Sequence, residues 1–208
     1  MKIAVIDYGL ANLRSVINAM ECLGVEPYLA EKGDQLAEAD KIILPGVGSF
    51  DAGMQGLRTR GHSEALNHYV YKHHVPCLGI CLGLQFFFEG SEEGKESGLG
   101  WFTGTVRYFD NQTVKVPHIG WNEIVTRPNT NMFADLDERL DVYFVHSYYV
   151  PYENDAALYC SGYCEYGQKY VAALEKGHIF GVQFHPEKSQ LAGMKILENF
   201  IQYENHQK

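Results

Sequence analysis

The sequence has no surplus of positive charge and no long hydrophobic run. Acidic residues outnumber basic ones by 26 to 17, and the formal net charge is −9. No stretch is dense in lysine and arginine, so nucleic-acid binding is not expected. The longest stretch without charge or histidine, 75–88, is too short to span a bilayer, and Asp7 interrupts any N-terminal signal-like segment. We therefore predict a cytoplasmic protein with no membrane partner.

The cysteines do not form the pattern of a secreted, disulfide-linked protein. There are five of them, an odd number at irregular spacing. Cys160 and Cys164 are separated by three residues, no second cysteine pair follows, and His178 and His185 lack ligand spacing. We therefore predict no metal site and no cofactor.

The length of 208 residues favours one domain covering 1–208. In the first half, all-apolar strands are expected at 2–6, 27–30, 41–45 and 76–80, with helical spacing of apolar residues between them. Strands without polar alternation, separated by helices, indicate a parallel sheet covered on both faces.

The second half has a different pattern. Segments rich in aromatic and β-branched residues read as strands joined by short turns. They cover 103–109, 141–150, 157–163, 170–174 and 178–184, and a helix is expected at 191–201. We predict an α/β fold, a three-layer sandwich of the flavodoxin-like kind, whose central sheet is mostly parallel and mixed.

Cys81 stands in a pattern typical of a nucleophile elbow. The sequence GICLG, 79–83, directly follows an apolar strand, and a helix is expected over 82–89. Glycines relieve the crowding of such a sharp corner, and a thiol at a helix N-terminus beside an imidazolium is a more reactive nucleophile. From this motif alone a buried turn cysteine is an equal alternative, and Cys77 fits a core thiol better.

His185 and Glu187 follow a second strand. Pro186 cannot continue a central sheet ladder, so this strand should end at the histidine. A cysteine nucleophile needs a base, and the base needs a group that fixes its tautomer. Cys81, His185 and Glu187 could supply these parts from adjacent strand ends, although a strand-terminal histidine alone is more often structural.

A glycine-rich loop, 44–50, lies between a strand and a helix. Its backbone N–H groups could bind a phosphate or stabilise an oxyanion. The phosphate interpretation is weak because the sequence has no P-loop pattern and no dinucleotide fingerprint after its first strand.

Together these motifs resemble those of class I glutamine amidotransferases. Within that class the chain is similar to the glutaminase subunits of imidazole glycerol phosphate synthases, with matches along nearly its whole length. The matching segments are IDYG, PGVG, GICLGLQ, GLGW, KVPHIGWN, YFVHSYY, YG and FGVQFHPEKS. KVPHIGWN and YFVHSYY distinguish this group from other class I glutaminases. Leu84 stands where the family commonly has methionine, and Ser49 replaces a common alanine.

The resemblance implies a role for each matching residue. Cys81 would attack the side-chain amide of L-glutamine, His185 would shuttle the proton, and Glu187 would orient His185. The oxyanion would be held by backbone N–H groups of Leu82 and of the segment Gly46, Val47 and Gly48. The substrate would be bound by Gln85, Glu93, His146, Ser147 and Tyr148. The synthase subunit would face Trp121, Asn122, Tyr143 and Lys188.

The resemblance also implies a partner. The ammonia would pass, within a heterodimer, to a synthase (cyclase) subunit that makes imidazole glycerol phosphate and AICAR in histidine biosynthesis. Close paralogues in bacterial surface-sugar gene clusters share these motifs and feed a sugar amidotransferase instead. A stand-alone Cys–His γ-glutamyl hydrolase or a non-catalytic binding subunit are further alternatives. The segment 115–122, with its exposed-type Trp121, is better explained by a partner surface.

Overall fold

The computed structural model describes residues 1–10 and 12–205, and a single mixed sheet forms its centre. One part of this sheet is parallel, with the order β2-β1-β3-β4-β12. Its strands are β1 (Ile3–Ile6), β2 (Tyr28–Ala30), β3 (Lys41–Gly46), β4 (Cys77–Cys81) and β12 (Ile179–Val182). The strands predicted for this part from apolar runs are confirmed.

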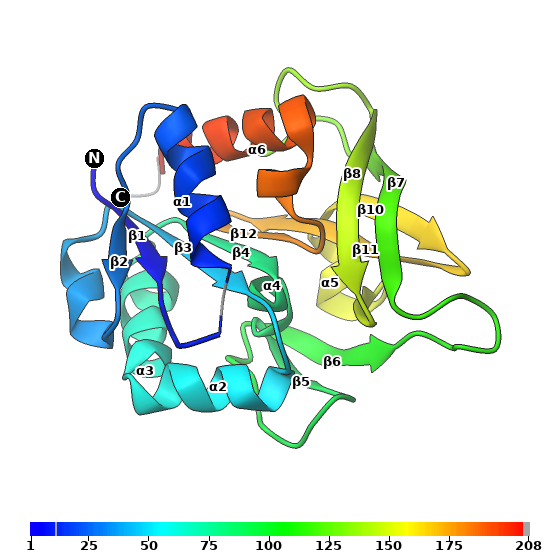
Figure 1. Cartoon of the computed structure of the whole chain (residues 1–208), viewed down its shortest axis with the longest axis horizontal. Coiled ribbons are helices and arrows are strands. Elements are labelled where there is room, and N and C mark those ends of the chain that lie inside the picture. Colours follow the sequence, from blue (N-terminus) through cyan, green and yellow to red (C-terminus); the bar gives the residue numbers. More distant parts are fainter. Residues whose placement is uncertain (11, 206–208) are drawn as a thin grey trace.

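Helices cover both faces of the parallel part (Figure 1). Ile3 and Val5 pack into the same core as buried residues of α1 (Leu13–Cys22) and α6 (Gln190–Gln202). The alternate residues Ala4 and Ile6 pack instead with α2 and α3. The latter helices are α2 (Phe50–Thr59) and α3 (His62–Leu66), followed by a helical turn at Asn67–Lys72. The predicted three-layer α/β sandwich is therefore confirmed, and it explains why these strands show no polar alternation.

An antiparallel part extends the sheet beyond β12 in the order β11-β10-β7-β8. A smaller group of strands, β5, β6 and β9, joins it through pairing of β9 with β11. The bounds are β5 (Phe88–Ser91), β6 (Phe102–Tyr108), β7 (His118–Thr126), β8 (Arg139–His146), β9 (Tyr148–Pro151), β10 (Cys160–Tyr166) and β11 (Gln168–Lys176). Short helices occur at Gly33–Glu38, α5 (Asn154–Leu158) and Pro186–Lys188.

Three local predictions were wrong. The helix expected over 82–89 is only α4 (Leu82–Gln85), because the following carbonyls accept backbone hydrogen bonds from the 99–102 segment rather than from the next helical turn. The strand expected over 141–150 is broken at Ser147 into β8 and β9, which pair with different partners. The segment 157–163 begins inside α5 before it becomes β10.

The arrangement brings the carboxyl ends of three parallel strands together. Gly46 at the end of β3 is paired with Cys81 at the end of β4, and Val182 of β12 is paired with Ile80.

Within residues 1–10 and 12–205, no helix is both long and apolar enough to cross a membrane.

Candidate active site

Cys81 occupies a strained corner between β4 and α4. Its φ is +55° and its ψ is −107°, a backbone conformation that is rare for a residue other than glycine. The turn is closely packed: a Cβ added to Gly83 would lie 1.8 Å from the carbonyl oxygen of Leu44, and one added to Gly79 would lie 2.7 Å from the Phe87 ring. The glycines of GICLG are thus required by close backbone approach, and the corner holds the thiol at the sheet edge.

His185 and Glu187 form a buried pair beside this corner. His185 Nδ1 lies 2.8 Å from Glu187 Oε1, and the two side chains are 3% and 2% exposed. The histidine backbone is held as well, because its N–H donates to the Tyr143 carbonyl and its own carbonyl accepts from the Ser189 hydroxyl. With Nδ1 committed to the carboxylate, Nε2 is the ring nitrogen available to Cys81.

The electrostatics of His185 depend on both neighbours. Burial acts to lower its pKa, but the neighbouring Cys81 and the hydrogen bond and charge of Glu187 outweigh it and raise the pKa to about 10. His185 therefore favours the imidazolium form next to Cys81. The four-residue helix α4 is too short to contribute much through its dipole, so the histidine is the main activating group.

Two groups contact the thiol that the sequence-based assignment missed. The Cys81 Sγ lies 3.9 Å from the Val145 carbonyl oxygen, and Gln183 Nε2 lies 3.6 Å from Sγ. Gln183 is part of the FGVQFHPEKS motif and could have been suspected from its position two residues before His185. The Val145 carbonyl is a backbone group and leaves no such signal in the sequence.

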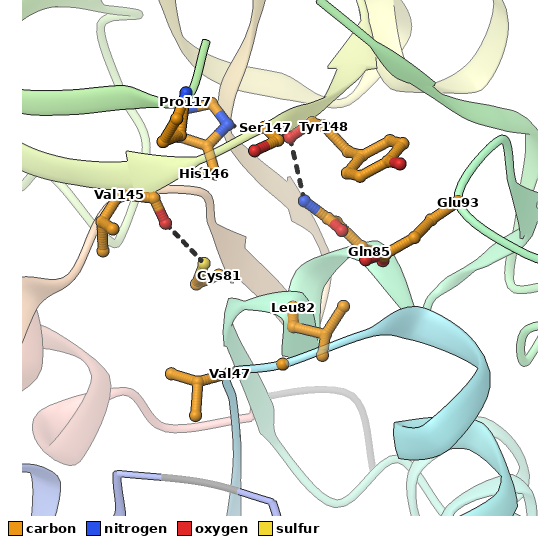
Figure 2. Close-up of a pocket in the computed structure, with 11 residues that line it drawn as sticks. Val47, Cys81, Leu82, Gln85, Glu93, Pro117, Val145, His146, Ser147 and Tyr148 are labelled. Carbon is orange, nitrogen blue, oxygen red and sulfur yellow. Dashed lines mark hydrogen bonds between the residues drawn. The ribbon is translucent and has the colours of Figure 1, made fainter.

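A pocket of about 320 Å³ opens next to Cys81 (Figure 2). This volume is at the small end of the range for ligand pockets. The pocket is lined by Val47, Gly48, Cys81, Leu82, Gln85, Glu93, Pro117, Val145, His146, Ser147 and Tyr148. All five residues expected to bind the substrate line this pocket. Three of the four residues expected at the oxyanion hole also line it, and Gly46 is the one that does not.

The side-chain amide of Gln85 has a fixed orientation in the pocket. Its Nε2 donates to the carbonyl of Tyr148 and to Oε1 of Gln183, both at 3.0 Å. Both amide hydrogens are therefore used, and Oε1 of Gln85 is the atom left to accept a hydrogen bond from a ligand.

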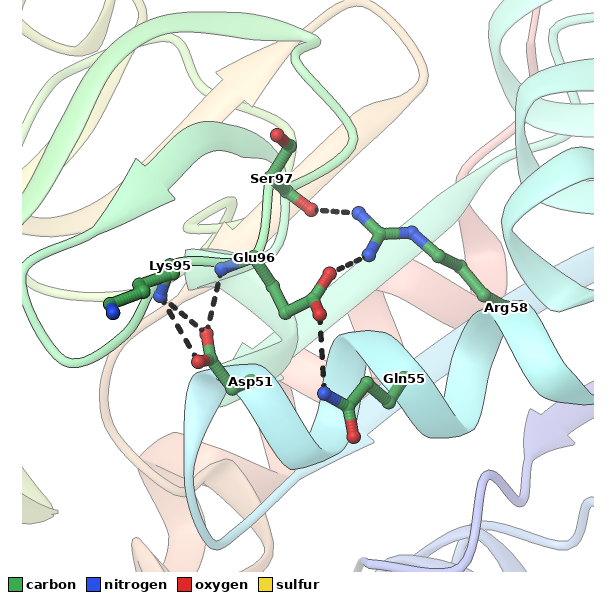
Figure 3. A network of polar contacts seen from close by, with 6 residues as sticks. All are labelled: Asp51, Gln55, Arg58, Lys95, Glu96 and Ser97. Atoms are coloured by element: carbon green, nitrogen blue, oxygen red, sulfur yellow. Dashed lines mark hydrogen bonds and ion pairs between the residues drawn. The ribbon is translucent and has the colours of Figure 1, made fainter.

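Glu93 closes another side of the pocket, where it accepts a 2.8 Å hydrogen bond from the backbone N–H of Phe50 at the start of α2. Burial raises its pKa, and this hydrogen bond acts in the opposite direction. The Glu93 segment is tied to α2 by a polar network (Figure 3). Asp51 accepts from the backbone N–H groups of Lys95 and Glu96, and Arg58 contacts Glu96 and Ser97. Glu93 is thus held by the helix that follows the glycine loop.

The loop Gly46–Gly48 packs over the buried Tyr8. A Cβ on Gly46 would lie 2.7 Å from both the Tyr8 hydroxyl and the Leu82 Cβ, whereas Gly48 has a φ of +99°. Gly46 is therefore required for packing and Gly48 for backbone conformation. Burial and the neighbouring Cys81 raise the pKa of Tyr8. The buried Tyr8 hydroxyl has no hydrogen-bond partner among the described residues and lies against Gly46; the sequence-based assignment did not single it out.

The residues expected at a partner surface do not all lie together. Trp121 is paired with Tyr143 in the β7–β8 ladder, their rings are 6.0 Å apart, and Lys188 Nζ lies 5.8 Å from the Tyr143 ring. Trp121 and Ile119 are 49% and 59% exposed on this face. Asn122 differs, because its side chain belongs to the opposite face of β7 and contacts His118.

Among residues 1–10 and 12–205, the remaining cysteines and histidines form no second reactive centre of this kind. All five cysteines are free, and burial raises the pKa of Cys160 and of Cys164 to about 11. In the part of the chain that the structure describes, no three His, Cys, Asp or Glu side chains are grouped so as to hold a metal ion.

Comparison with known proteins shows the family to which the chain belongs. A family model described as glutamine amidotransferase class-I matches residues 4–203. Two solved structures share the fold: one titled glutamine amidotransferase, with a TM-score of 0.75, 15% identity and coverage of 96% of both chains, and PurLQS from Thermotoga maritima, with a TM-score of 0.69, 20% identity and coverage of 96% and 97%.

Curated relatives are much more similar in sequence. Imidazole glycerol phosphate synthase subunit HisH 1 of Campylobacter jejuni is 45% identical over 96% of this chain and 98% of its own length. Subunit HisH 2 of Pseudomonas aeruginosa is 43% identical with the same coverage, and subunit HisH of Thermosynechococcus vestitus is 41% identical over 96% and 95%. The chain belongs to the class-I glutamine amidotransferases and, within them, to the family of these HisH subunits.

Proposed function

We propose that the chain is a glutaminase subunit that hydrolyses L-glutamine to glutamate and ammonia, with the whole of 1–208 acting as one domain. The observation that carries this proposal is the buried His185–Glu187 pair beside the positive-φ Cys81, at the wall of a small pocket. Family membership supports the same activity.

In this mechanism Cys81 attacks the side-chain carbonyl carbon of glutamine. The negative charge that develops on the oxygen is held by backbone N–H groups of Leu82 and of the Val47–Gly48 region. When the C–N bond breaks, the His185 imidazolium gives its proton to the leaving nitrogen, and ammonia departs. His185 is then neutral and accepts a proton from the water that attacks the thioester. The C–S bond breaks, glutamate is released, and the starting state with a protonated His185 and a free Cys81 sulfur is restored. Glu187 keeps Nδ1 protonated throughout.

The pocket offers complementary groups for the rest of the substrate. Glu93 places a carboxylate at one side, which suits the α-ammonium group of an amino acid. Oxygen Oε1 of Gln85 is a free acceptor, because both hydrogens of that amide are used within the protein. These groups suit the free α-amino acid end of glutamine.

The ammonia goes to a synthase (cyclase) subunit, in a cytoplasmic heterodimer, for imidazole glycerol phosphate synthesis. The printed names of the curated relatives support this acceptor. The exposed cluster of Ile119, Trp121, Tyr143 and Lys188 supports a partner surface close to the catalytic pair, since Tyr143 also binds the backbone of His185. Some relatives bear the numbers 1 and 2, which keeps a paralogue feeding a sugar amidotransferase as the second candidate.

A mechanism-based electrophile tests the glutaminase proposal directly. A glutamine-like diazo-ketone should alkylate Cys81 and leave Cys22, Cys77, Cys160 and Cys164 unmodified, as measured by peptide mass spectrometry. Excess L-glutamine should protect Cys81. Labelling at any other cysteine, or no protection, would contradict the assignment. Transfer of ¹⁵N from amide-labelled glutamine into product, with each candidate partner added, distinguishes the two acceptors.

A further inference from the structure

A buried polar cluster adjoins the glutamine pocket, and one of its members, His146, lines the pocket; the proposed mechanism assigns no proton transfer to it. The cluster consists of His118 in β7, His146 at the end of β8 and Tyr170 in β11, and all three side chains are buried. His118 is paired with His146 in the β7–β8 ladder. Phe109 and Phe144 pack against both histidine rings. A polar cluster in such an apolar setting needs its hydrogen bonds satisfied internally.

The hydrogen-bond partners of His146 fix its tautomer. Its Nδ1 lies 2.8 Å from the Tyr148 carbonyl oxygen, and a carbonyl oxygen only accepts, so Nδ1 carries the hydrogen. Burial lowers the pKa of His146 to about 3, despite the opposing effect of this hydrogen bond. The ring is therefore neutral, and its Nε2 is an acceptor.

The same reasoning continues outward through His118. Its Nδ1 lies 3.2 Å from the accepting Nε2 of His146, so this Nδ1 must donate. Burial lowers the pKa of His118 to about 4, which leaves its Nε2 as an acceptor. Asn122 Nδ2 lies 3.3 Å from that atom and donates to it. The Asn122 amide cannot be reversed without loss, because its Oδ1 accepts from the backbone N–H of Glu123 at 2.9 Å.

Tyr170 provides a second hydrogen-bond route from His118 to His146, with the same direction of donation. Its hydroxyl lies 3.3 Å from His118 Nδ1 and 3.4 Å from His146 Nε2. It can accept from the first and donate to the second, so neither tautomer has to change. Every donor in the cluster thus points from Asn122 toward the pocket.

The inner end of this chain reaches the substrate pocket. The Tyr148 carbonyl that accepts from His146 also accepts from Gln85, and Gln85 continues through Gln183 to the thiol of Cys81. Figure 2 shows His146, Tyr148 and Gln85 around the same side of the pocket. The outer end, Asn122, directly follows Trp121 of the exposed cluster described above.

We propose that Asn122, His118 and His146 are positioning residues that form a one-directional hydrogen-bond relay between the outer end of β7 and the glutamine pocket. The relay rests on the proposed function, because it requires glutamine to bind beside Gln85 and Tyr148. A partner that binds Trp121 would affect the pocket through the adjacent Asn122. Because coupling between two sites is reciprocal, glutamine binding should change the environment of the Asn122 side chain.

Nitrogen NMR of the histidine side chains tests the direction of the relay in the unmodified full chain. We expect His118 and His146 both to carry hydrogen on Nδ1 at neutral pH. His178 is a matched control, since this buried histidine uses Nε2 toward the Val70 carbonyl and should show the other tautomer. Hydrogen on Nε2 of His146 would overturn the proposal.

A second measurement tests the coupling with L-glutamine bound to the Cys81→Ala variant. The backbone amide of Ser147 in the pocket reports binding, and the side-chain amide of Asn122 reports the relay. We expect both to shift on binding. When His118→Phe is added, the Ser147 shift should persist and the Asn122 shift should be lost. No shift at Ser147 would contradict the proposed function, whereas an Asn122 shift that is absent in the first variant or persists in the second would contradict the relay.

Steady-state kinetics separate a positioning role from a purely structural one. His118→Phe keeps a ring between Tyr166 and Phe144, at centroid distances of 3.9 and 4.8 Å, but removes both hydrogen bonds. We expect a KM for glutamine that is raised about three- to tenfold, the effect of a typical hydrogen bond, with little change in kcat. Asn122→Ala should shift KM in the same direction without altering the core, and His178→Phe should not. An unchanged KM in both relay variants would overturn the proposal.

Discussion

The parallel and antiparallel parts of the sheet contribute different kinds of groups to the site. The ends of β3 and β4 and the segment after β12 bring Gly46, Cys81 and His185 together on closely packed backbone. Of these groups His185 is charged, because its pKa is raised to about 10. The antiparallel strands β7 and β8 contribute His118, His146 and the Val145 carbonyl, which are neutral. The parallel part thus supplies the groups proposed for bond breaking, and the antiparallel part supplies neutral groups around the pocket.

The largest expected effect comes from removing the nucleophile of the parallel part. Cys81→Ala should reduce glutamine hydrolysis by about 10⁴-fold or more, since nucleophile loss in comparable sites has effects of this size or larger. Synthesis by the partner complex with added ammonium salt should continue, because the acceptor chemistry lies on another subunit. The assay is glutamate release beside ammonium-dependent product formation.

Cys77 is the matched control, four residues earlier in the same strand. It is fully buried, and burial alone raises its pKa. Cys77→Ala should lower the free energy of unfolding by about 1 kcal/mol while activity stays within a few-fold. Glutamine-dependent product formation by the Cys81 variant would remove the distinction between the two thiols.

The next effects concern the buried pair. His185→Asn should abolish most hydrolysis, and Glu187→Gln should retain about two orders of magnitude more activity, since the carboxylate orients the base without transferring protons itself. Glu187 also raises the pKa of His185, so its loss should lower that pKa. The imidazolium is then lost at lower pH, and the alkaline limb of the Cys81 alkylation rate should move to lower pH in Glu187→Gln. An alkaline limb that moves to higher pH, or does not move, would contradict this assignment.

The same contrast explains what the sequence could predict. In the parallel part, close backbone approach at Gly79 and Gly83 demands glycine, and Pro186 limits the strand before it, although β12 already ends at Val182 and not at His185 as expected. Such requirements leave local patterns, and the fold layers and the placement of Cys81, His185 and Glu187 could be predicted from them.

The antiparallel part left fewer local signals. Asn122 was placed at a partner surface by resemblance, but it lies on the opposite face from Trp121, which only strand register decides. The contact between His118 and His146 joins residues 28 positions apart. The helix expected through Phe88 failed because the 99–102 segment competes for its carbonyls. Such tertiary choices cannot be predicted from periodicity.

Two substitutions, one in the glycine loop and one at Tyr8 against it, should change the rate of glutamine hydrolysis in opposite directions. Val47→Pro removes the backbone N–H that could serve the oxyanion, and should lower kcat about 10²- to 10³-fold. Tyr8→Phe removes a buried, unpartnered hydroxyl that lies against Gly46, which leaves the loop more room to turn a backbone N–H toward the pocket. We expect the isolated subunit to gain activity by about three- to tenfold.

The control for these two variants is to measure the rate of glutamine hydrolysis with and without the partner. If the loop must shift against Tyr8 when the partner binds, the stimulation factor should shrink in Tyr8→Phe while the maximal rate of the complex stays the same. A lower basal rate in Tyr8→Phe would show that the hydroxyl supports the active loop instead.

The smallest expected effect tests whether holding the substrate also depends on the parallel part. Asp51 in α2 binds the backbone of Lys95 and Glu96 and so fixes the segment that carries Glu93. These N–H groups lower the pKa of Asp51, so the tether is complete above the ordinary pKa of an aspartate and is lost as the pH falls below it. Asp51→Ala should therefore raise the KM for glutamine about three- to tenfold with kcat nearly unchanged.

Asp155 is a matched control, because it also accepts a backbone hydrogen bond, from Thr103, but outside the pocket lining. Asp155→Ala should leave KM unchanged. Equal effects of the two variants would mean that general loosening, and not the position of Glu93, determines substrate affinity.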